Sequence, residues 1–264
     1  MPVLQRAAAG VTLAYEVRGA GFPVLLLAPG GMRSAMHMWR TSPYDPWAKL
    51  PGDVFKVIAM DQRNAGGSHG PLCKGWHCYR DDQLELLDHL GVGKCLIVGS
   101  CIGPSYALNL MKHSPERFPA AVFLQPIGLA PHTSEPGLPW RGLNKSATTH
   151  WFGDWANAMV EAQAFERHAL ASLYKSLFED STGHDFVFSV SRDDVSNLER
   201  QHLLIFQGKD VFHPSETARE IARLAPHAEL IEQWRDEGYS SEVDVRIADF
   251  LMAHVAGPGC STPH

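Results

Sequence analysis

A chain of 264 residues, of which 45% are hydrophobic and 20% charged, is long enough to bury a large core in one domain or in a core with an insertion. Its formal net charge of −6 is spread without long runs of one sign, which gives no electrostatic basis for binding nucleic acid or an anionic membrane surface. Composition therefore argues against both partner classes and favours an ordinary globular protein.

The first third of the chain alternates strand-like and helix-like segments. Residues 11–19 alternate polar and apolar side chains, as a half-exposed strand does, whereas 23–29 and 55–61 are the continuous apolar runs of strands covered on both faces. Residues 79–91 place three leucines on one helical face, and the run 94–100 that follows predicts another buried strand.

The same alternation continues to the end of the chain. It predicts strands at 120–127, 202–208 and 228–234, and helices at about 103–113, 214–225 and 242–255. Strands that alternate with helices indicate a mostly parallel sheet with helices on both faces, so the expected fold class is α/β.

Residues 128–197 interrupt this pattern, because they contain helix-like segments and no good buried strand. An unstructured loop of that length is improbable in a compact domain. We therefore expect a core formed by 1–127 and 198–264, with a helical cap inserted at 128–197.

Targeting and cofactor signals are missing from the sequence. The N-terminal segment has one early arginine and no long apolar stretch, and the longest apolar runs are too short to cross a bilayer. No metal cluster, phosphate loop or nucleotide fingerprint appears, so no cofactor is expected. The cysteines form an odd set without a CxxC pair, which predicts reduced thiols and a cytoplasmic location: Cys73, Cys78, Cys95, Cys101 and Cys260.

One short motif carries the strongest chemical signal. A predicted strand runs into Gly99-Ser100-Cys101-Ile102-Gly103, and a predicted helix follows. This arrangement resembles the nucleophile elbow of the α/β-hydrolase fold superfamily, with cysteine in the usual serine position. In such a turn the strand and the helix almost touch, so that a Cβ two residues to either side of the nucleophile would clash.

Three further segments resemble the same family in the same order. Residues 25–34 resemble the loop after the third strand, whose backbone amide, here that of Gly31 or Met32, joins the amide of Ile102 in an oxyanion hole. Residues 60–68 resemble the turn beneath the elbow. Residues 206–222 resemble the loop that delivers the acid of the triad, with Asp210 in the acid position.

The sequence departs from the family at the general base. The histidine of the family follows the last strand, and the corresponding loop, 233–243, contains none. Without a base a serine hydroxyl would be nearly inert, but a thiol depends on it less, because a cysteine ionises near pH 8.5 and more easily at a helix N-terminus. Cysteine at 101 and the missing histidine are therefore consistent with one linked change.

Two histidines are candidates for a replacement base. His213, three residues after Asp210, lies on a loop that in this family is beside the elbow, so it could approach Cys101 from a new position; it could equally cap the next helix or face solvent. His37 is the second candidate. Asp210 then orients His213 or remains as a relic.

The remaining expectations concern substrate binding. Residues of the predicted cap and of the cleft edge are candidates to contact a small, partly apolar molecule, although ordinary packing explains aromatic residues equally well. They are His37, Trp39, Gln125, His150, Trp151 and Trp155.

A cysteine elbow predicts hydrolysis or acyl transfer on an activated ester, lactone or thioester, because a thiolate is itself easily expelled and amides are poor substrates for it. Two alternatives use the same pocket. One is a lyase, cyclase or isomerase that stabilises an enolate in the oxyanion hole, and the other is a ligand-binding protein with a degenerate site. The sequence leaves the oligomeric state open.

Overall fold

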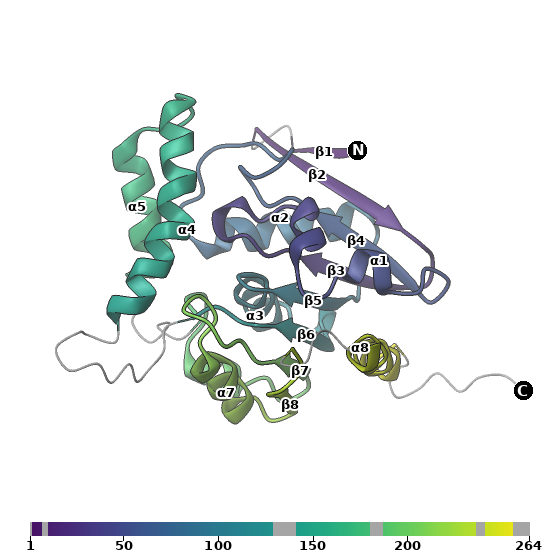
Figure 1. Cartoon of the computed structure of the whole chain (residues 1–264). Coiled ribbons are helices and arrows are strands. Elements are labelled where there is room, and N and C mark those ends of the chain that lie inside the picture. The colour runs from purple at the N-terminus through teal and green to yellow at the C-terminus, as the bar shows by residue number, and fades with distance from the viewer. Residues whose placement is uncertain (1, 7–9, 129–140, 180–186, 236–240, 256–264) are drawn as a thin grey trace, which may run out of the picture.

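A computed structural model of the chain describes residues 2–6, 10–128, 141–179, 187–235 and 241–255, with side chains omitted at 141–150. Eight strands form a single sheet in the order β1-β2-β4-β3-β5-β6-β7-β8 (Figure 1). The strands are β1 (Val3–Arg6), β2 (Val11–Arg18), β3 (Phe22–Leu27), β4 (Phe55–Met60), β5 (Leu96–Ser100), β6 (Ala120–Leu124), β7 (His202–Phe206) and β8 (Ala228–Ile231).

The sheet is mostly parallel, as expected. β1 pairs antiparallel with β2, and β2 antiparallel with β4, while all pairs from β4 to β8 are parallel. The α/β fold class is therefore confirmed. The sequence pattern had not predicted β1, a short strand at the edge of the sheet beside β2.

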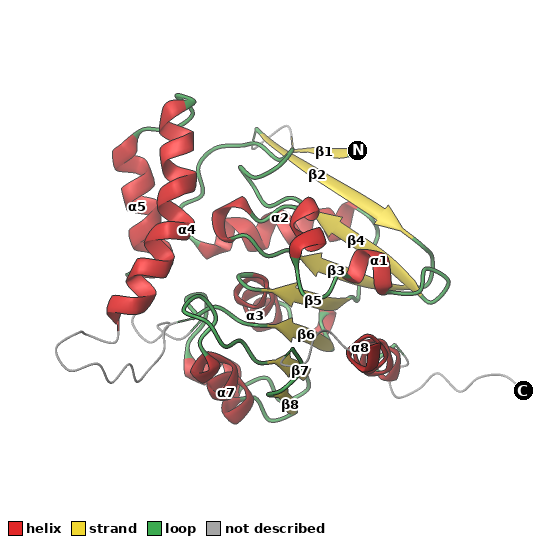
Figure 2. Ribbon diagram, viewed as in Figure 1, coloured by secondary structure: helices red, strands yellow, loops and turns green. Residues whose placement is uncertain are grey.

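Helices cover both faces of the sheet (Figure 2). The helices are α1 (Pro46–Lys49), α2 (Trp76–His89), α3 (Gly103–His113), α4 (Arg141–Glu161), α5 (Arg167–Phe178), α6 (Arg192–Ser196), α7 (Ser215–Leu224) and α8 (Ser241–Ala253), with short 3-10 helices η1 (Gly31–Arg33), η2 (Met36–Thr41) and η3 (Pro115–Arg117). Side chains of α2, α3 and α7 belong to one apolar cluster, and those of α8 belong to the other.

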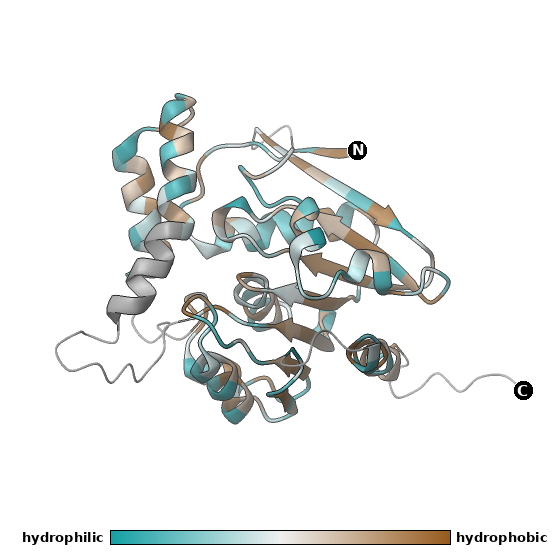
Figure 3. Cartoon of the chain, in the orientation of Figure 1, coloured by the Kyte–Doolittle hydropathy of each residue, from teal (hydrophilic) through white to brown (hydrophobic). Residues whose placement is uncertain are grey.

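The period-two geometry of a strand explains this layering. Along β3, Leu25 and Leu27 pack into the cluster that includes α2 and α3, whereas Val24 and Leu26 pack into the cluster that includes α8. Figure 3 shows the central strands as the most hydrophobic part of the molecule. The continuous apolar runs of the sequence are thus strands buried on both faces.

The interrupting segment 128–197 contributes helices and no strand within its described part. α4 and α5 pack against each other and stand together beside the sheet, and α4 also contacts η1 (Figure 1). The helical insertion therefore reaches the loop that follows β3.

No helix among the described residues is long and apolar enough to cross a membrane.

Candidate active site

Cys101 occupies the tight turn between β5 and α3. Its φ of 60° lies in the left-handed region, which is uncommon for a residue with a side chain. A Cβ on Gly99 would lie 2.8 Å from the Gly103 carbonyl carbon, and a Cβ on Gly103 would lie 2.3 Å from the Leu27 carbonyl oxygen. The two glycines are therefore required where strand and helix backbones approach most closely, as the elbow motif predicts.

Backbone hydrogen bonds hold Cys101 rigidly at the end of the sheet. Its amide donates to the Leu124 carbonyl at 3.0 Å, and its own carbonyl accepts the Ile127 amide at 2.9 Å. Its side chain is 6% exposed. The sulfur therefore belongs to a fixed residue at the carboxyl end of the central strands, where open α/β sheets place their ligands.

The loop after β3 supplies the second half of a candidate oxyanion hole. Gly30, with a φ of 113°, turns the chain into η1, where Gly31 and Met32 are buried. The amides of Met32 and Ile102 make no hydrogen bond to an acceptor in the described residues. Unused backbone donors of this kind can stabilise a developing negative charge.

His213 and Asp210 lie together on the loop between β7 and α7. His213 Nδ1 lies 2.8 Å from Asp210 Oδ1, and the same oxygen accepts the backbone amides of Phe212 and His213 at 2.9 Å each. The hydrogen bond from His213 is the main reason that the pKa of Asp210 falls below its usual value. A separation of three residues thus allows this carboxylate to orient the ring.

The other ring nitrogen of His213, Nε2, is buried and makes no well-aligned hydrogen bond to a described residue. Burial alone would lower the pKa of His213, but the charge of the Cys101 thiolate and the hydrogen bonds with Asp210 and Cys101 outweigh it and raise the pKa to about 9. Cys101 and Nε2 are therefore near enough to interact, although the contact falls short of ideal hydrogen-bond geometry. His213 and Cys101 are brought together, and Asp210 lies behind the ring.

Gly208 determines where His213 can lie. A Cβ on Gly208 would lie 2.4 Å from both the Cβ and the carbonyl oxygen of His213. The sequence analysis did not select Gly208, although its place between strand and acid in the segment 206–210 was a signal that close packing was needed. Gly208 thus serves as a positioning residue for the imidazole.

Trp151, on α4, connects the two loops of the candidate site. A Cβ on Gly31 would lie 2.9 Å from the Trp151 Cβ, and the indole lies with its centroid 5.5 Å from that of Phe212 and 6.4 Å from that of His213. The helical insertion therefore places an aromatic side chain directly beside the oxyanion loop and the imidazole.

Other sequence-predicted residues lie elsewhere. His37 and Trp39 line a cavity of about 310 Å³ whose lining includes neither Cys101 nor His213. Trp155 is buried in the core and donates from Nε1 to the Asn64 carbonyl at 3.1 Å. The backbone of His150 is in α4, but its side chain lies outside the described residues.

Gln125 follows β6 at the same edge of the sheet as Cys101. Its φ is 43°, its amide donates to the Phe206 carbonyl at 2.7 Å, and its side chain accepts a hydrogen bond from Arg235. Arg235 belongs to the loop after β8, in which the histidine of the family is missing. Gln125 thus lies beside the elbow in space, because the Cys101 amide donates to the adjacent Leu124 carbonyl, and it is hydrogen bonded to that loop.

Comparison with protein families agrees with this geometry. Residues 23–227 match the family model described as alpha/beta hydrolase fold. The chain is also 24% identical over 236 residues to the proline iminopeptidase of Neisseria gonorrhoeae, a match that covers 67% of this chain and 73% of the iminopeptidase.

Solved structures resemble most of the chain. The meta-cleavage product hydrolase CumD of Pseudomonas fluorescens IP01 superposes with a TM-score of 0.64 and 19% identity, and the match covers 92% of this chain and 95% of CumD. Est816, described as an N-acyl homoserine lactone degrading enzyme, gives a TM-score of 0.60 and 20% identity over 96% of this chain and all of its own. At these identities the likeness concerns the fold.

Proposed function

Because the chain belongs to the α/β-hydrolase fold family, we propose that it is a hydrolase or acyltransferase in which Cys101 is the nucleophile and His213 a relocated acid and base. The observation that carries this proposal is the position of His213: one ring nitrogen is held by Asp210 at 2.8 Å, and the other is buried on the side of Cys101. This geometry supports a nucleophile, imidazole and carboxylate set like that of the family, with the imidazole supplied from a different loop.

The first half of the reaction forms a thioester. The Cys101 thiolate attacks the carbonyl carbon of the substrate, and the oxyanion that develops accepts hydrogen bonds from the amides of Ile102 and of Gly31 or Met32. A raised pKa keeps His213 protonated near neutral pH, so it donates its proton to the departing oxygen or sulfur. The leaving group departs neutral, and the acyl group remains on the sulfur.

The second half regenerates the thiol. His213 is neutral after donating its proton, and in that form it removes a proton from water or from an acceptor alcohol or thiol that attacks the thioester. Collapse of the second tetrahedral species expels the Cys101 thiolate and restores the imidazolium. Asp210 supports both steps because it fixes the ring and favours its charged form.

The chemistry of a thiolate limits the substrate class. A thiolate is a better leaving group than an unprotonated amide nitrogen, so an amide adduct collapses backwards unless that nitrogen is protonated, whereas esters, lactones and thioesters go forward more readily. Trp151 and Phe212 place apolar surface beside His213, which favours a substrate that is partly apolar. The lactone activity named for Est816 is of this chemical class, and the peptide substrate implied by the name proline iminopeptidase is not.

Rapid mixing with p-nitrophenyl acetate tests the proposal. A covalent mechanism predicts a burst of p-nitrophenol close to one equivalent of enzyme, followed by slower turnover. The burst should be absent from Cys101→Ala and retained in Cys78→Ala, which removes the other accessible thiol. Steady turnover without a burst that survives in Cys101→Ala would favour the enolate-stabilising alternative, and ligand binding without any product would favour a degenerate binding protein.

A further inference from the structure

A second thiol cluster lies at the start of α2, outside the candidate active site. Cys73 is buried in the loop before α2, and Cys78 is half-buried in its first turn. No spacing motif pairs them, but the loop folds back so that Cys78 packs against the apolar cluster that contains Cys73, and the two thiols act on each other's pKa. Two cysteines brought this near to each other are candidates for a disulfide.

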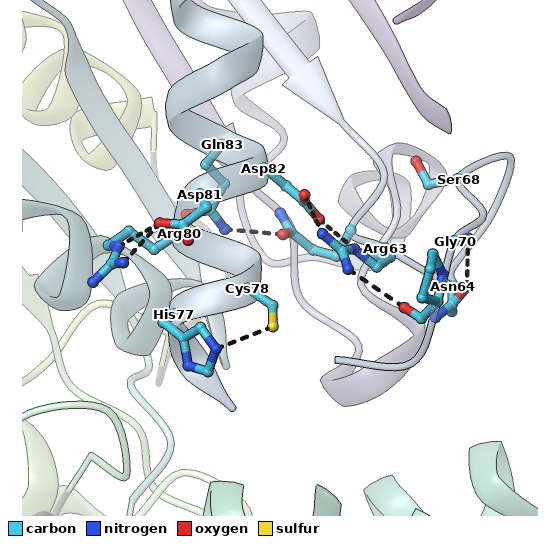
Figure 4. A network of polar contacts seen from close by, with 12 residues as sticks. Arg63, Asn64, Ser68, Gly70, His77, Cys78, Arg80, Asp81, Asp82 and Gln83 are labelled. Carbon is cyan, nitrogen blue, oxygen red and sulfur yellow. Dashed lines mark hydrogen bonds and ion pairs between the residues drawn. The ribbon is translucent and has the colours of Figure 1, made fainter. Parts of the chain in front are cut away.

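The surroundings of Cys78 favour its thiolate. The Lys74 amide donates to its sulfur at 3.3 Å. His77 Nε2 lies 3.4 Å from the same sulfur (Figure 4). Its place in the first turn of a helix adds the positive end of the helix dipole. The hydrogen bond from Cys73 and these contacts, together with the charges of His77 and Arg63, outweigh burial and lower the pKa of Cys78 to about 5.

Cys73 has the opposite character. Its hydrogen bond to Cys78 and its burial both raise its pKa far above the usual value, so its proton is retained and is donated to Cys78. Arg63, whose charge acts on both sulfurs, is fixed in turn by a buried ion pair with Asp82 (Figure 4). The pair is thus an accessible, ionised thiol with a protonated thiol behind it, as in reactive and resolving cysteines.

We propose that Cys73 and Cys78 form a reversible oxidation site for hydrogen peroxide or small organic peroxides. The Cys78 sulfur attacks one peroxide oxygen, a sulfur–oxygen bond forms as the O–O bond breaks, and the other oxygen leaves as water or alcohol after protonation. Cys73 then attacks the Cys78 sulfenic acid, the disulfide forms, and water leaves with the proton of Cys73. Two electrons pass from the thiols to the peroxide, and a small thiol reverses the reaction.

The site is positioned to influence the helical insertion. Ser176 Oγ of α5 donates to the Lys74 carbonyl at 2.7 Å, and Trp76 Nε1 donates to the Leu177 carbonyl at 3.1 Å. The loop between the two cysteines is therefore the one that anchors the end of α5. Trp76 also packs edge-on against Tyr106, a residue close enough to both Cys73 and Cys101 for their charges to raise its pKa.

Peptide mapping of the full-length protein tests the proposal, because Lys74 separates the two cysteines. Trypsin cleaves after Lys74 and after Arg80, so Cys73 and Cys78 end in different peptides, 64–74 and 75–80. After brief treatment with one equivalent of hydrogen peroxide and alkylation of the remaining thiols, we expect these two peptides to be joined by a disulfide. Dithiothreitol should separate them and restore alkylation of both.

Cys95 provides the internal control, because burial raises its pKa to about 12 and its thiol donates to the Leu96 carbonyl at 3.0 Å. It should remain alkylatable after denaturation. In Cys73→Ser the linked peptides should disappear and dimedone should trap the Cys78 sulfenic acid. The proposal would be overturned if the oxidised wild-type protein gave no linked peptides, or if Cys78 were oxidised no faster than Cys95.

Discussion

The two ends of β5 carry one cysteine each, and the contrast between them shows what makes a thiol chemically useful. Cys95 immediately precedes the strand, is 1% exposed, and donates its thiol hydrogen to a backbone carbonyl. Cys101 immediately follows the strand, is 6% exposed, has a φ of 60°, and lies near the buried imidazole of His213. Burial is almost the same, so the difference lies in the neighbours.

Topology supplies those neighbours. The carboxyl ends of the parallel strands β3, β5, β6 and β7 meet at one edge of the sheet, and the loops that leave this edge contain the candidate oxyanion amides, the elbow and His213. The other edge carries the imidazoles of His202, His227 and His254, but no described histidine acts on the Cys95 thiol, which donates to a backbone carbonyl instead. The position of a cysteine relative to the strand direction, rather than its burial, thus separates a candidate nucleophile from a core residue.

Substitution of Cys101 and of Cys95 should give the largest difference in activity between two variants. Cys101→Ala should lower kcat/KM for an activated ester by about a thousandfold or more, because the covalent route is lost. Cys95→Ala should leave kcat/KM unchanged and lower the free energy of unfolding by about 1 kcal/mol through a small cavity. Steady-state kinetics and urea unfolding of both variants measure the contrast, and equal losses of activity would contradict it.

Removal of the imidazole should have the next largest effect. His213→Ala should lower kcat by about 10²- to 10⁴-fold, because both the acid for the leaving group and the base for water are lost. His37→Ala is the matched control, since His37 lines a separate cavity and its loss should leave kcat unchanged. The reverse pattern would transfer the role of base to His37.

A backbone substitution tests the placement of the imidazole without removing it. Gly208→Ala introduces a Cβ 2.4 Å from His213 and should lower kcat by about 10²-fold, because a displacement of about 1 Å is enough for that loss. Gly93→Ala, where a Cβ meets nothing within 4 Å, is the control and should leave kcat unchanged. Full activity of Gly208→Ala would mean that His213 need not lie where the structure places it.

The smallest predicted effect is on stability and depends on pH. The pKa of His213 is raised in the folded state above its unfolded value of about 6.5, so the added stability is fully present below pH 6.5 and is lost as pH rises through about 9. The wild type should exceed His213→Gln by about 3 kcal/mol near pH 6.5, and the difference should shrink by pH 10. Urea unfolding of both proteins measures it, and a difference that grows with pH would contradict the ion pair.

The sequence was most informative where chemistry restricts backbone and side chain together. Gly99, Cys101 and Gly103 predicted the elbow because only glycine tolerates the contacts on either side. The continuous apolar runs predicted the buried strands for a similar reason, since a strand covered on both faces has no polar side. Local patterns of this kind depend on residues that are adjacent in the chain.

Features that depend on how distant loops fold were harder to predict. Trp39 and Trp151 were both candidates to contact substrate, yet Trp39 is buried on the α8 face of the sheet and Trp151 packs beside His213. The contact of Cys73 with Cys78 depends on a loop that folds back onto its own helix, and no spacing rule indicates it. Placement of His213 relative to Cys101 was likewise only a hypothesis without the β7–α7 loop geometry.

The most direct test of the central claim uses one tryptic peptide, because residues 95–112 contain both cysteines of the β5 comparison. The enzyme is mixed with p-nitrophenyl acetate, quenched in acid within the burst, digested briefly with trypsin at neutral pH in dilute denaturant, and fragmented in a mass spectrometer. The account predicts an acetyl group on Cys101 and none on Cys95. Turnover of the ester with both sulfurs unmodified throughout the burst would contradict it.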